Sequence, residues 1–340
     1  MNLTLICKGG VNTGLGHLHR ALSFIHGAAG LVSFNLVAII EPGLESLFRK
    51  HPGATLIYSD QDLEQALSSV KDEHNICLID MLTLGADQCR MLRARYRRIY
   101  SLSPVFSDLS IIDVVFTRFS GHSYPPHIKV YSGLEYAIFN TNCQPISDED
   151  YRRTIAEEHL TIAVSMGGTD APNKTLMILK ALARVKFDLT IWVLLGEGYG
   201  HSYQELVDTI KKDSHHEIVL VKSNRSMWRI LSHCAVAIFA GGLTSFEAIY
   251  AGLPTLNILD NESQKDLVPK ELVDCGATQF IGVIGPESLD LLIRYINSFH
   301  VDRELLSAMR HNTNNLLDGS GAMRTAQMVI DELIQMKTAE

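Results

Sequence analysis

The chain has 340 residues, of which 46% are hydrophobic and 20% are charged, and its formal net charge is −8 at pH 7. This composition is typical of a soluble globular protein and excludes a disordered or fibrous one. The length exceeds what a single core normally fills and therefore predicts two domains. The negative charge argues against nucleic acid as a partner, because DNA and RNA binders usually carry a basic stripe.

Targeting segments and cysteine usage bear on the compartment. No signal-like segment precedes the first predicted strand, and no apolar run reaches the ~18 residues of a membrane span. The six cysteines are scattered and form no C-x-x-C pair, which favours small buried thiols in a reducing compartment. We therefore expect a cytoplasmic protein without an integral membrane segment. Contact with a membrane surface and the oligomeric state stay open.

Short apolar strands alternate with helical patterns from the first residues onward. In the first half the predicted strands are 3–7, 33–40, 55–58, 76–80, 99–102 and 114–116. Between them lie the predicted helices 17–28, 43–49, 62–70 and 86–96. Near-continuous apolar strands separated by helices are typical of a parallel sheet that is covered on both faces.

A polar, charged interval at about residues 140–159 interrupts this alternation, which then resumes. The predicted strands of the second half are 160–165, 189–195, 218–221, 236–239 and 255–258, with helices that include 174–184 and 245–251. Three helices close the chain, the last over 322–336. The fold class predicted is α/β, with two doubly wound Rossmann-like domains, 1–150 and 151–340, facing each other across a cleft. Loops at the carboxyl ends of the strands would line that cleft.

The first glycine-rich loop, GGVNTGLGHLHR at residues 9–20, connects the first strand to the first helix. Gly14 and Gly16 favour unusual backbone conformations and let a ligand, such as a diphosphate, approach the main chain. His17 is expected in the first turn of the helix, where the positive helix end disfavours imidazolium, so that the neutral ring can act as a general base. Arg20 lies one turn further on, on the same face. The alternative is a surface histidine beside a tight turn.

Two other interpretations of this loop are weaker. A dinucleotide fingerprint G-x-G-x-x-G would need glycine where His19 stands, although Glu41 could hold a ribose after the second strand. His17 and His19 have no obvious carboxylate or cysteine companion, and the pair His215–His216 lies in a polar segment. We therefore expect no metal and no cofactor.

The second loop, SMGGTDAPNKT at residues 165–175, follows the first strand of the second half. Gly167 and Gly168 expose backbone donors, and Asn173 stands where a helix begins, so this loop is a candidate phosphate site with Thr169 nearby. Asp170 would repel a phosphate if it pointed inward, so it is expected to cap the helix or to face solvent. A plain capped turn is the alternative.

The third loop, AGGLTSFEAIYAGLPTLNI, spans residues 240–258. Gly241 and Gly242 end a strand, Thr244 or Ser245 can cap the next helix, and Glu247 is expected in its first turn. A carboxylate there can accept hydrogen bonds from the two hydroxyls of a ribose, or it can simply favour the helix dipole.

These three loops together carry a family resemblance. The motifs G-L-G-H-x-x-R, S-M-G-G-T-D-x-x-N and G-G-L-T-S-F-E-A-x-x-A-G-L-P resemble those of GT-B-type nucleotide-sugar enzymes. They are most similar to the UDP-2,4-diacetamido-2,4,6-trideoxy-β-L-altropyranose hydrolases of pseudaminic acid biosynthesis, which are related to the MurG-like glycosyltransferases. Segments 133–137 and 318–322 extend the resemblance over most of the chain.

The resemblance implies roles for particular residues. His17 corresponds to the base that activates water for attack at the anomeric carbon, with Arg20 and Asp80 in the same site. The nucleotide side is implied for residues of the second half, namely Gly167, Gly168, Thr169, Asn173, Ser223, Met227, Gly241, Gly242, Thr244 and Glu247. Residues 223–227 would border a uracil, and helix ends rather than a metal would neutralise the leaving diphosphate.

The chain departs from this family pattern on the sugar side. An Asp-Asp pair usual after the strand at 99–102 is replaced by Ser103-Pro104, Leu82 replaces an aromatic residue, and the usual Asn-Gln pair after residue 258 is spread over 261–264. The leading hypothesis is a UDP-sugar hydrolase in surface-glycan biosynthesis. A GT-B glycosyltransferase with a sugar or lipid acceptor is the second, and a non-catalytic nucleotide-sugar binding protein is the third. The partner expected in each case is a nucleotide-sugar.

Overall fold

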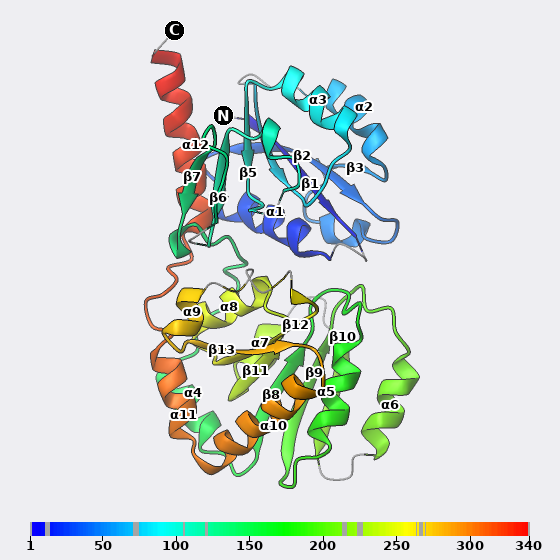
Figure 1. The fold of residues 1–340 in the computed structure, drawn as a ribbon, viewed down its shortest axis with the longest axis vertical. Helices are drawn as coiled ribbons and strands as arrows, with labels where there is room; N and C mark the ends of the chain where they lie inside the picture. The colour runs from blue at the N-terminus through cyan, green and yellow to red at the C-terminus, as the bar shows by residue number, and fades with distance from the viewer. Residues whose placement is uncertain are drawn as a thin grey trace. The chain divides into compact units, whose positions relative to one another are not determined.

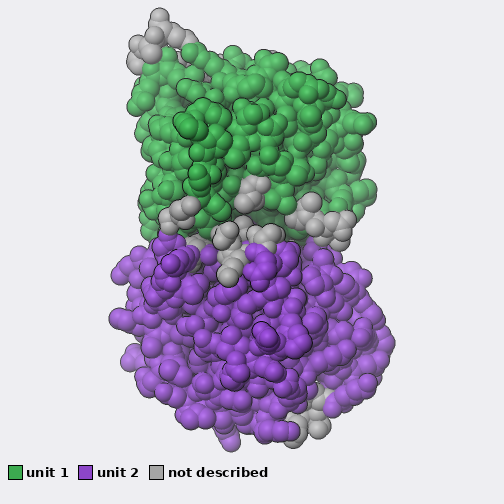
Figure 2. All heavy atoms as spheres, viewed as in Figure 1, with its two compact units in different colours: residues 1–141, 318–340 green, residues 142–317 purple. Residues whose placement is uncertain are grey.

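The computed structural model describes residues 2–10, 14–70, 75–104, 106–119, 122–212, 216–222, 227–262, 264, 268 and 270–338. They form two compact units (Figure 2). Unit 1 comprises residues 1–141 and 318–340, and unit 2 comprises residues 142–317. The structure thus divides the chain near residue 141 rather than at 150, and it places the last segment, expected in the second domain, with the first.

The described residues of unit 1 form a seven-stranded parallel sheet in the order β3-β2-β1-β4-β5-β6-β7 (Figure 1). Its strands are β1 (Asn2–Gly9), β2 (Ser33–Ile40), β3 (Thr55–Ile57), β4 (Ile76–Asp80), β5 (Arg98–Ser101), β6 (Val114–Thr117) and β7 (Lys129–Ser132). Its helices are α1 (Gly16–Gly27), α2 (Leu63–Ser68), α3 (Ala86–Arg95) and α12 (Gly321–Thr338), with 3-10 turns η1 (Glu45–Phe48), η2 (Asp60–Asp62), η3 (Leu109–Ile111) and η4 (Leu134–Tyr136).

Alternation along the strands explains the two layers of helices in unit 1. On β1, Leu3 and Leu5 point to the face that is covered by α1 and α12, whereas Ile6 points to the face that is covered by α2 and α3. Both faces of the sheet are therefore apolar, as a parallel sheet requires. Phe24 of α1 and Ala326 of α12 are fully buried on the first face.

The C-terminal helix α12 is fastened to unit 1 by a polar contact as well as by its apolar face. Glu332 accepts hydrogen bonds from Tyr100 at 2.8 Å, from Tyr131 at 2.9 Å and from Lys129 at 2.7 Å. Tyr100 belongs to β5, and the other two partners belong to β7. These contacts explain why the last segment joins unit 1 although it is far from the first half in the sequence.

The described residues of unit 2 form a six-stranded parallel sheet in the order β10-β9-β8-β11-β12-β13. Its strands are β8 (Leu160–Ser165), β9 (Leu189–Leu195), β10 (Glu217–Lys222), β11 (Val236–Phe239), β12 (Thr255–Leu259) and β13 (Thr278–Val283). Its helices are α4 (Asp148–Ile155), α5 (Lys174–Leu182), α6 (Tyr203–Lys212), α7 (Met227–Leu231), α8 (Leu243–Ala251), α9 (Lys270–Asp274), α10 (Pro286–Val301) and α11 (Glu304–His311).

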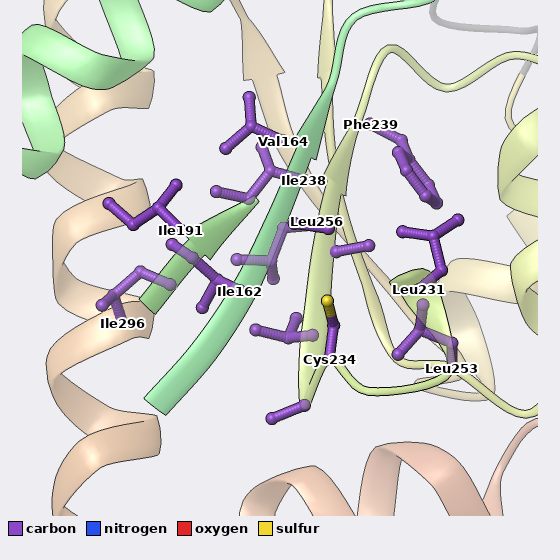
Figure 3. Packing of buried hydrophobic residues seen from close by; sticks show 14 of the residues in the cluster. Ile162, Val164, Ile191, Leu231, Cys234, Ile238, Phe239, Leu253, Leu256 and Ile296 are labelled. Atoms are coloured by element: carbon purple, nitrogen blue, oxygen red, sulfur yellow. The ribbon is translucent and has the colours of Figure 1, made fainter. Parts of the chain in front are cut away.

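The core of unit 2 lies on both faces of this sheet (Figure 3). Ile296 of α10 packs beside Ile162 and Ile191 on one face, and Leu231 lies with Phe239 on the other. Burial of each such side chain contributes about 1.5–3 kcal/mol to folding. The strands β8, β9 and β11 are apolar almost throughout, so helices pack against both faces of the same strands.

The strands predicted at 33–40, 76–80, 160–165, 189–195 and 236–239 are confirmed to the residue. The sequence did not predict β7 and β13, which lie at the edges of their sheets; β7 is mostly exposed and β13 is partly buried. Residues 43–49, predicted as a helix, form only the 3-10 turn η1. Among the described helices, none has the length and apolar character needed to cross a bilayer.

Candidate functional site

The predicted base and its neighbours lie where the strand order of unit 1 reverses. From β1 the sheet continues through β2 on one side and through β4 on the other. His17 is in the first turn of α1, which follows β1, and Asp80 is the last residue of β4. The register pairs Cys7 of β1 with Asp80, so both segments end at the same edge of the sheet. Open α/β sheets bind ligands at the carboxyl edge at this reversal.

His17 is held in one orientation by Asp80. Its Nδ1 lies 2.7 Å from Asp80 Oδ1. An ionised carboxylate can only accept, so Nδ1 must carry the hydrogen and donate it. The lone pair of the ring is then on Nε2, which is the atom that a general base uses to take a proton. The aspartate therefore selects the tautomer in which His17 Nε2 can accept a proton.

Arg20 fixes the same carboxylate from the other side. Its Nε donates to Asp80 Oδ2 at 2.8 Å and its Nη2 donates to Oδ1 at 2.5 Å, a two-point contact that is both directional and charge-assisted. Asp80 is fully buried, and burial raises its pKa, but the Arg20 guanidinium and the hydrogen bond from His17 together hold that pKa below its ordinary value. The 3.1 Å approach of Arg20 Nη2 to His17 Nδ1 is a contact between two donors.

The structure thus brings together the three residues His17, Arg20 and Asp80, which the sequence analysis assigned to one site. The predicted position of His17 in the first helical turn and the shared face of His17 and Arg20 are confirmed. Gly14 has φ of +78°, a left-handed conformation that glycine adopts easily, which explains why a glycine stands at this position. Gly16 opens α1 with a φ outside the left-handed region, so the expectation of an unusual conformation is wrong there.

One charged residue at this edge escaped the sequence analysis. Arg118 follows β6 directly and is 8% exposed, with its guanidinium 4.4 Å from the ring centroid of Phe119. Burial and the nearby Arg20 lower the pKa of Arg118 to about 9, while Asp80 opposes that shift. The signal in the sequence was a single arginine immediately after an apolar strand. Ser103 lies two residues after the end of β5, which is the strand between β4 and β6, and it is fully buried.

In unit 2 the strand order reverses between β8 and β11, and the two glycine-rich loops follow these strands. The register pairs Phe239 with Ser165, which are the last residues of β11 and β8. Gly167 and Gly241 each come two residues later and have φ of +84° and +76°. The two loops predicted to bind the diphosphate therefore start at the same edge of the sheet.

The loop after β8 is closed by its own aspartate. Asp170 Oδ1 accepts from the backbone N–H of Lys174 at 2.8 Å and Oδ2 accepts from that of Thr175 at 2.9 Å. The expectation that Asp170 caps the helix is confirmed. Burial raises the pKa of Asp170, although these hydrogen bonds lower it. Because the carboxylate occupies the first N–H groups of α5, this helix end is not available to a phosphate, and that part of the prediction is corrected.

The remaining polar groups of this loop face the segment after β9. Gly168 O accepts from Gly198 N at 2.9 Å, and the Asn173 side chain accepts from Tyr199 OH at 2.8 Å. Thr169 is buried and lies against the same segment. This loop is thus packed against the segment after β9 through Gly168, Thr169 and Asn173. Contact of these residues and of Gly167 with a diphosphate stays a prediction.

The start of α8 differs from that of α5. Its N-cap is Gly242, which has no side chain to cap the helix. Thr244 or Ser245 was expected to cap, but the structure has Thr244 inside the helix, and Ser245 Oγ donates to Asn257 Oδ1 at 2.7 Å instead. Uncapped N–H groups at a helix start are suited to an anion. Of the two helix starts predicted to bind phosphate, α8 is therefore the better candidate, since its glycine N-cap brings no carboxylate to the first N–H groups.

Two further predictions concern the nucleotide itself. Glu247 is the fifth residue of α8 and thus lies in the second turn, not in the first as predicted. Met227 is the first residue of α7 and packs partly against the core. Ser223 and the rest of 223–226 lie outside the described residues, as does His215. Among the described side chains, no group of three or more His, Cys, Asp or Glu residues could hold a metal ion.

Comparison with curated proteins gives two distant relatives, and no protein family model matches the chain. An uncharacterized protein of Methanocaldococcus jannaschii is 24% identical over 280 residues, which are 78% of this chain but only 57% of that protein. The spore coat polysaccharide biosynthesis protein SpsG of Bacillus subtilis is 22% identical over 345 residues, which cover 97% of this chain and 98% of SpsG. The chain therefore spans little more than half the length of the first relative.

Solved structures resemble the chain over almost its whole length. MurG of Acinetobacter baumannii has a TM-score of 0.66 and 14% identity, with 97% of this chain and all of MurG covered. MnaA of S. aureus in complex with UDP has a TM-score of 0.63 and 13% identity over 96% of each chain. UDP-GlcNAc 2-epimerase of Neisseria meningitidis bound to UDP-GlcNAc has a TM-score of 0.61 and 10% identity, covering 98% and 100%. The predicted GT-B-like fold of two doubly wound α/β units is thereby confirmed.

Proposed function

We propose that the protein is a nucleotide-sugar hydrolase that releases UDP from a UDP-activated deoxy-amino sugar, in the biosynthesis of a surface glycan such as a nonulosonic acid. Unit 2 would bind the nucleotide, and unit 1 would supply the base. The observation that carries this proposal is the His17 ring, held by Asp80 with Nε2 left to accept a proton. It stands at the strand-order reversal where α/β sheets bind substrates.

The proposed reaction is a displacement at the anomeric carbon. His17 Nε2 takes a proton from water, and the water oxygen forms a bond to the anomeric carbon. The bond from that carbon to the diphosphate oxygen breaks, and its electron pair leaves with UDP. Asp80 stabilises the imidazolium that forms, and Arg20 keeps Asp80 ionised and in place.

Two findings support nucleotide binding by unit 2. The N-cap of α8 is Gly242, which has no side chain, and a helix start that follows two glycines can stabilise the charge of a leaving diphosphate. Proteins of the same fold have been solved with UDP and with UDP-GlcNAc, and the relative SpsG is named for polysaccharide biosynthesis. Glu247 would then be the ribose contact and Met227 would border the base.

A glycosyltransferase is the second candidate. The same histidine can deprotonate a sugar or lipid hydroxyl in place of water, and Ser103 stands where the hydrolase pattern has an acidic residue. Release of UDP that requires an added acceptor would favour it, whereas steady release into water favours the hydrolase. Conversion of the UDP-sugar into an isomer without UDP release would indicate an epimerase, the activity named for the N. meningitidis neighbour.

The test is UDP release from a panel of UDP-sugars by wild type, His17→Ala and His19→Ala. His19 lies on the same helix but is exposed, so its variant is the matched control. We expect His17→Ala to lower kcat by about 10²–10⁴-fold with UDP affinity unchanged, as loss of a general base does. Equal turnover by wild type and His17→Ala would remove His17 from the mechanism. Tight UDP binding without turnover of any donor would indicate a non-catalytic binding protein.

A further inference from the structure

Lys174 is a buried cation that the sequence analysis did not single out. It is the first residue of α5 and has no exposed surface. Removing an ammonium from water costs several kcal/mol unless it is paired and hydrogen-bonded. A charged lysine at this buried position therefore requires partners that are held in place.

Those partners belong to the segment at the carboxyl end of β12. Lys174 Nζ donates to the backbone oxygen of Ile258 at 3.0 Å and forms an ion pair with Asp260. Asp260 is held from the other side by Gln264, which accepts from its backbone N–H at 3.0 Å and donates to its carboxylate at 3.2 Å. Lys174 thus links the start of α5 to the segment that follows β12, which is far from it in the sequence.

That segment lies directly beside the turn that leads into α8. A Cβ added at Gly241 would lie 2.5 Å from Leu259 Cδ2 and 3.0 Å from Val268 Cγ2, so the glycine turn packs closely on residues on both sides of Asp260 in the sequence. Asp260 follows Leu259 immediately, and its side chain is 30% exposed. The segment that packs on the turn before α8 therefore carries a carboxylate, one residue after Leu259.

We infer that Lys174 is a positioning residue for anion binding at the start of α8. It neutralises Asp260 and holds its carboxylate at the start of α5. Without the lysine, the Asp260 charge would be left unneutralised and would repel a diphosphate bound at the start of α8, because a partly buried site screens like charges less than water does. This inference rests on the proposed function, since it assumes that a diphosphate binds at that helix start.

The experiment compares wild type, Lys174→Met, Asp260→Asn, the double variant and the control Lys180→Met by calorimetric titration with UDP and with inorganic pyrophosphate. Lys180 is an exposed lysine on the same helix, 3.5 Å from Glu205. Lys174→Met is expected to weaken both ligands by at least about tenfold. Asp260→Asn, which leaves Lys174 without its counter-charge, is expected to bind at least as tightly as wild type. Lys180→Met should bind like wild type.

The double variant separates charge from structure. It removes both charges together, so we expect UDP affinity to return to within about threefold of wild type, a recovery that general damage to the fold would not give. The loss in Lys174→Met should also shrink as salt rises, since screening weakens the repulsion. Wild-type affinity in Lys174→Met, or a double variant as weak as the single one, would overturn the inference. If wild type binds pyrophosphate but not UDP, the proposed function fails while the inference is still decided by pyrophosphate.

Discussion

The two units use the same point of the same type of sheet in different ways. In unit 1 the strand-order reversal is occupied by interacting side chains, His17, Asp80 and Arg20. In unit 2 the corresponding edge presents backbone at Gly241–Gly242, where α8 begins with a glycine N-cap. The charged side chains Asp170 and Lys174 there bind backbone groups or another charged side chain. Side chains can move a proton, and backbone amides can hold an anion without moving one. This difference agrees with the proposal that unit 1 supplies the base and unit 2 binds the nucleotide.

Asp80→Asn gives the largest expected effect and tests the side-chain half of this comparison. The amide keeps the shape but can donate toward Nδ1, so the tautomer with a free Nε2 is lost and kcat should fall by about 10²–10⁴-fold. UDP affinity should not change. Because Arg20 loses its buried counter-charge, unit 1 should also lose about 3–5 kcal/mol of stability, so kinetics must be measured well below the melting temperature.

A matched control separates these two consequences. Asp113 binds Arg93 and Arg98 at 2.7 and 3.3 Å in the same unit, at the start of β6 and thus away from the carboxyl edge. Asp113→Asn should lower the melting temperature and leave kcat unchanged. Full activity in Asp80→Asn would contradict the role of the aspartate in selecting the tautomer of His17.

Gly241→Ala tests the backbone half. Gly241 has φ of +76°, and a new Cβ would collide with Leu259, so the turn must shift. We expect UDP affinity to fall about tenfold, equivalent to about 1.4 kcal/mol. Stability should fall by about 1–3 kcal/mol. Calorimetry and thermal unfolding measure the two effects.

Gly43→Ala is the control for Gly241→Ala. Gly43 lies in unit 1 and has φ of +96°, and no atom lies near the position of a new Cβ. Its alanine variant therefore loses stability only because alanine disfavours this backbone conformation, by about 1 kcal/mol. UDP affinity should be unchanged in it. If Gly241→Ala binds UDP as tightly as Gly43→Ala does, then the turn before α8 is not part of the nucleotide site.

The sequence predicted the central strands and the three loops because continuous apolar runs and glycine clusters are local signals. It predicted that Asp170 caps α5 or faces solvent, but it could not decide between the two, because the same residue type at the same position suits both. Lys174 and Asp260 are 86 residues apart, and only the fold joins them. The sequence could likewise not assign α12 to unit 1, since the contacts of Glu332 with Tyr100 and Tyr131 connect distant segments.

The two units are also expected to differ in their stability toward acid, which is the smallest of the expected effects. In unit 1, burial raises the pKa of Asp80 and of Glu332, but their cationic and hydrogen-bonding partners bring both below the ordinary values of 3.8 and 4.5. In unit 2, burial raises the pKa of Asp170. Groups with a lowered pKa stabilise the fold above their ordinary pKa, and this contribution is lost as pH falls through the pKa in the folded state. A raised pKa has the opposite sign, so Asp170 does not make unit 2 acid-labile.

We therefore expect acid to unfold unit 1 before unit 2. Trp192 and Trp228 are the two tryptophans of the chain, and both lie in unit 2, so tryptophan fluorescence follows that unit alone. As pH falls below about 4, far-UV circular dichroism should change before the fluorescence does. Asp148 in unit 2 also has a lowered pKa, caused by Arg310, but it is exposed, and solvent screens that pair.

Glu332→Gln shows whether the contacts of α12 contribute to this acid sensitivity. At pH 7 the variant should lose about 1 kcal/mol from the unfolding free energy of unit 1, because its bonds from Lys129 and the two tyrosines no longer reach a charged acceptor. At an acidic pH low enough to protonate Glu332 in wild type, the difference between the two proteins should shrink. Urea unfolding followed by circular dichroism at both pH values measures this. A difference that stays the same at both, or fluorescence that changes first in acid, would show that the ionised carboxylates of unit 1 do not determine its acid stability.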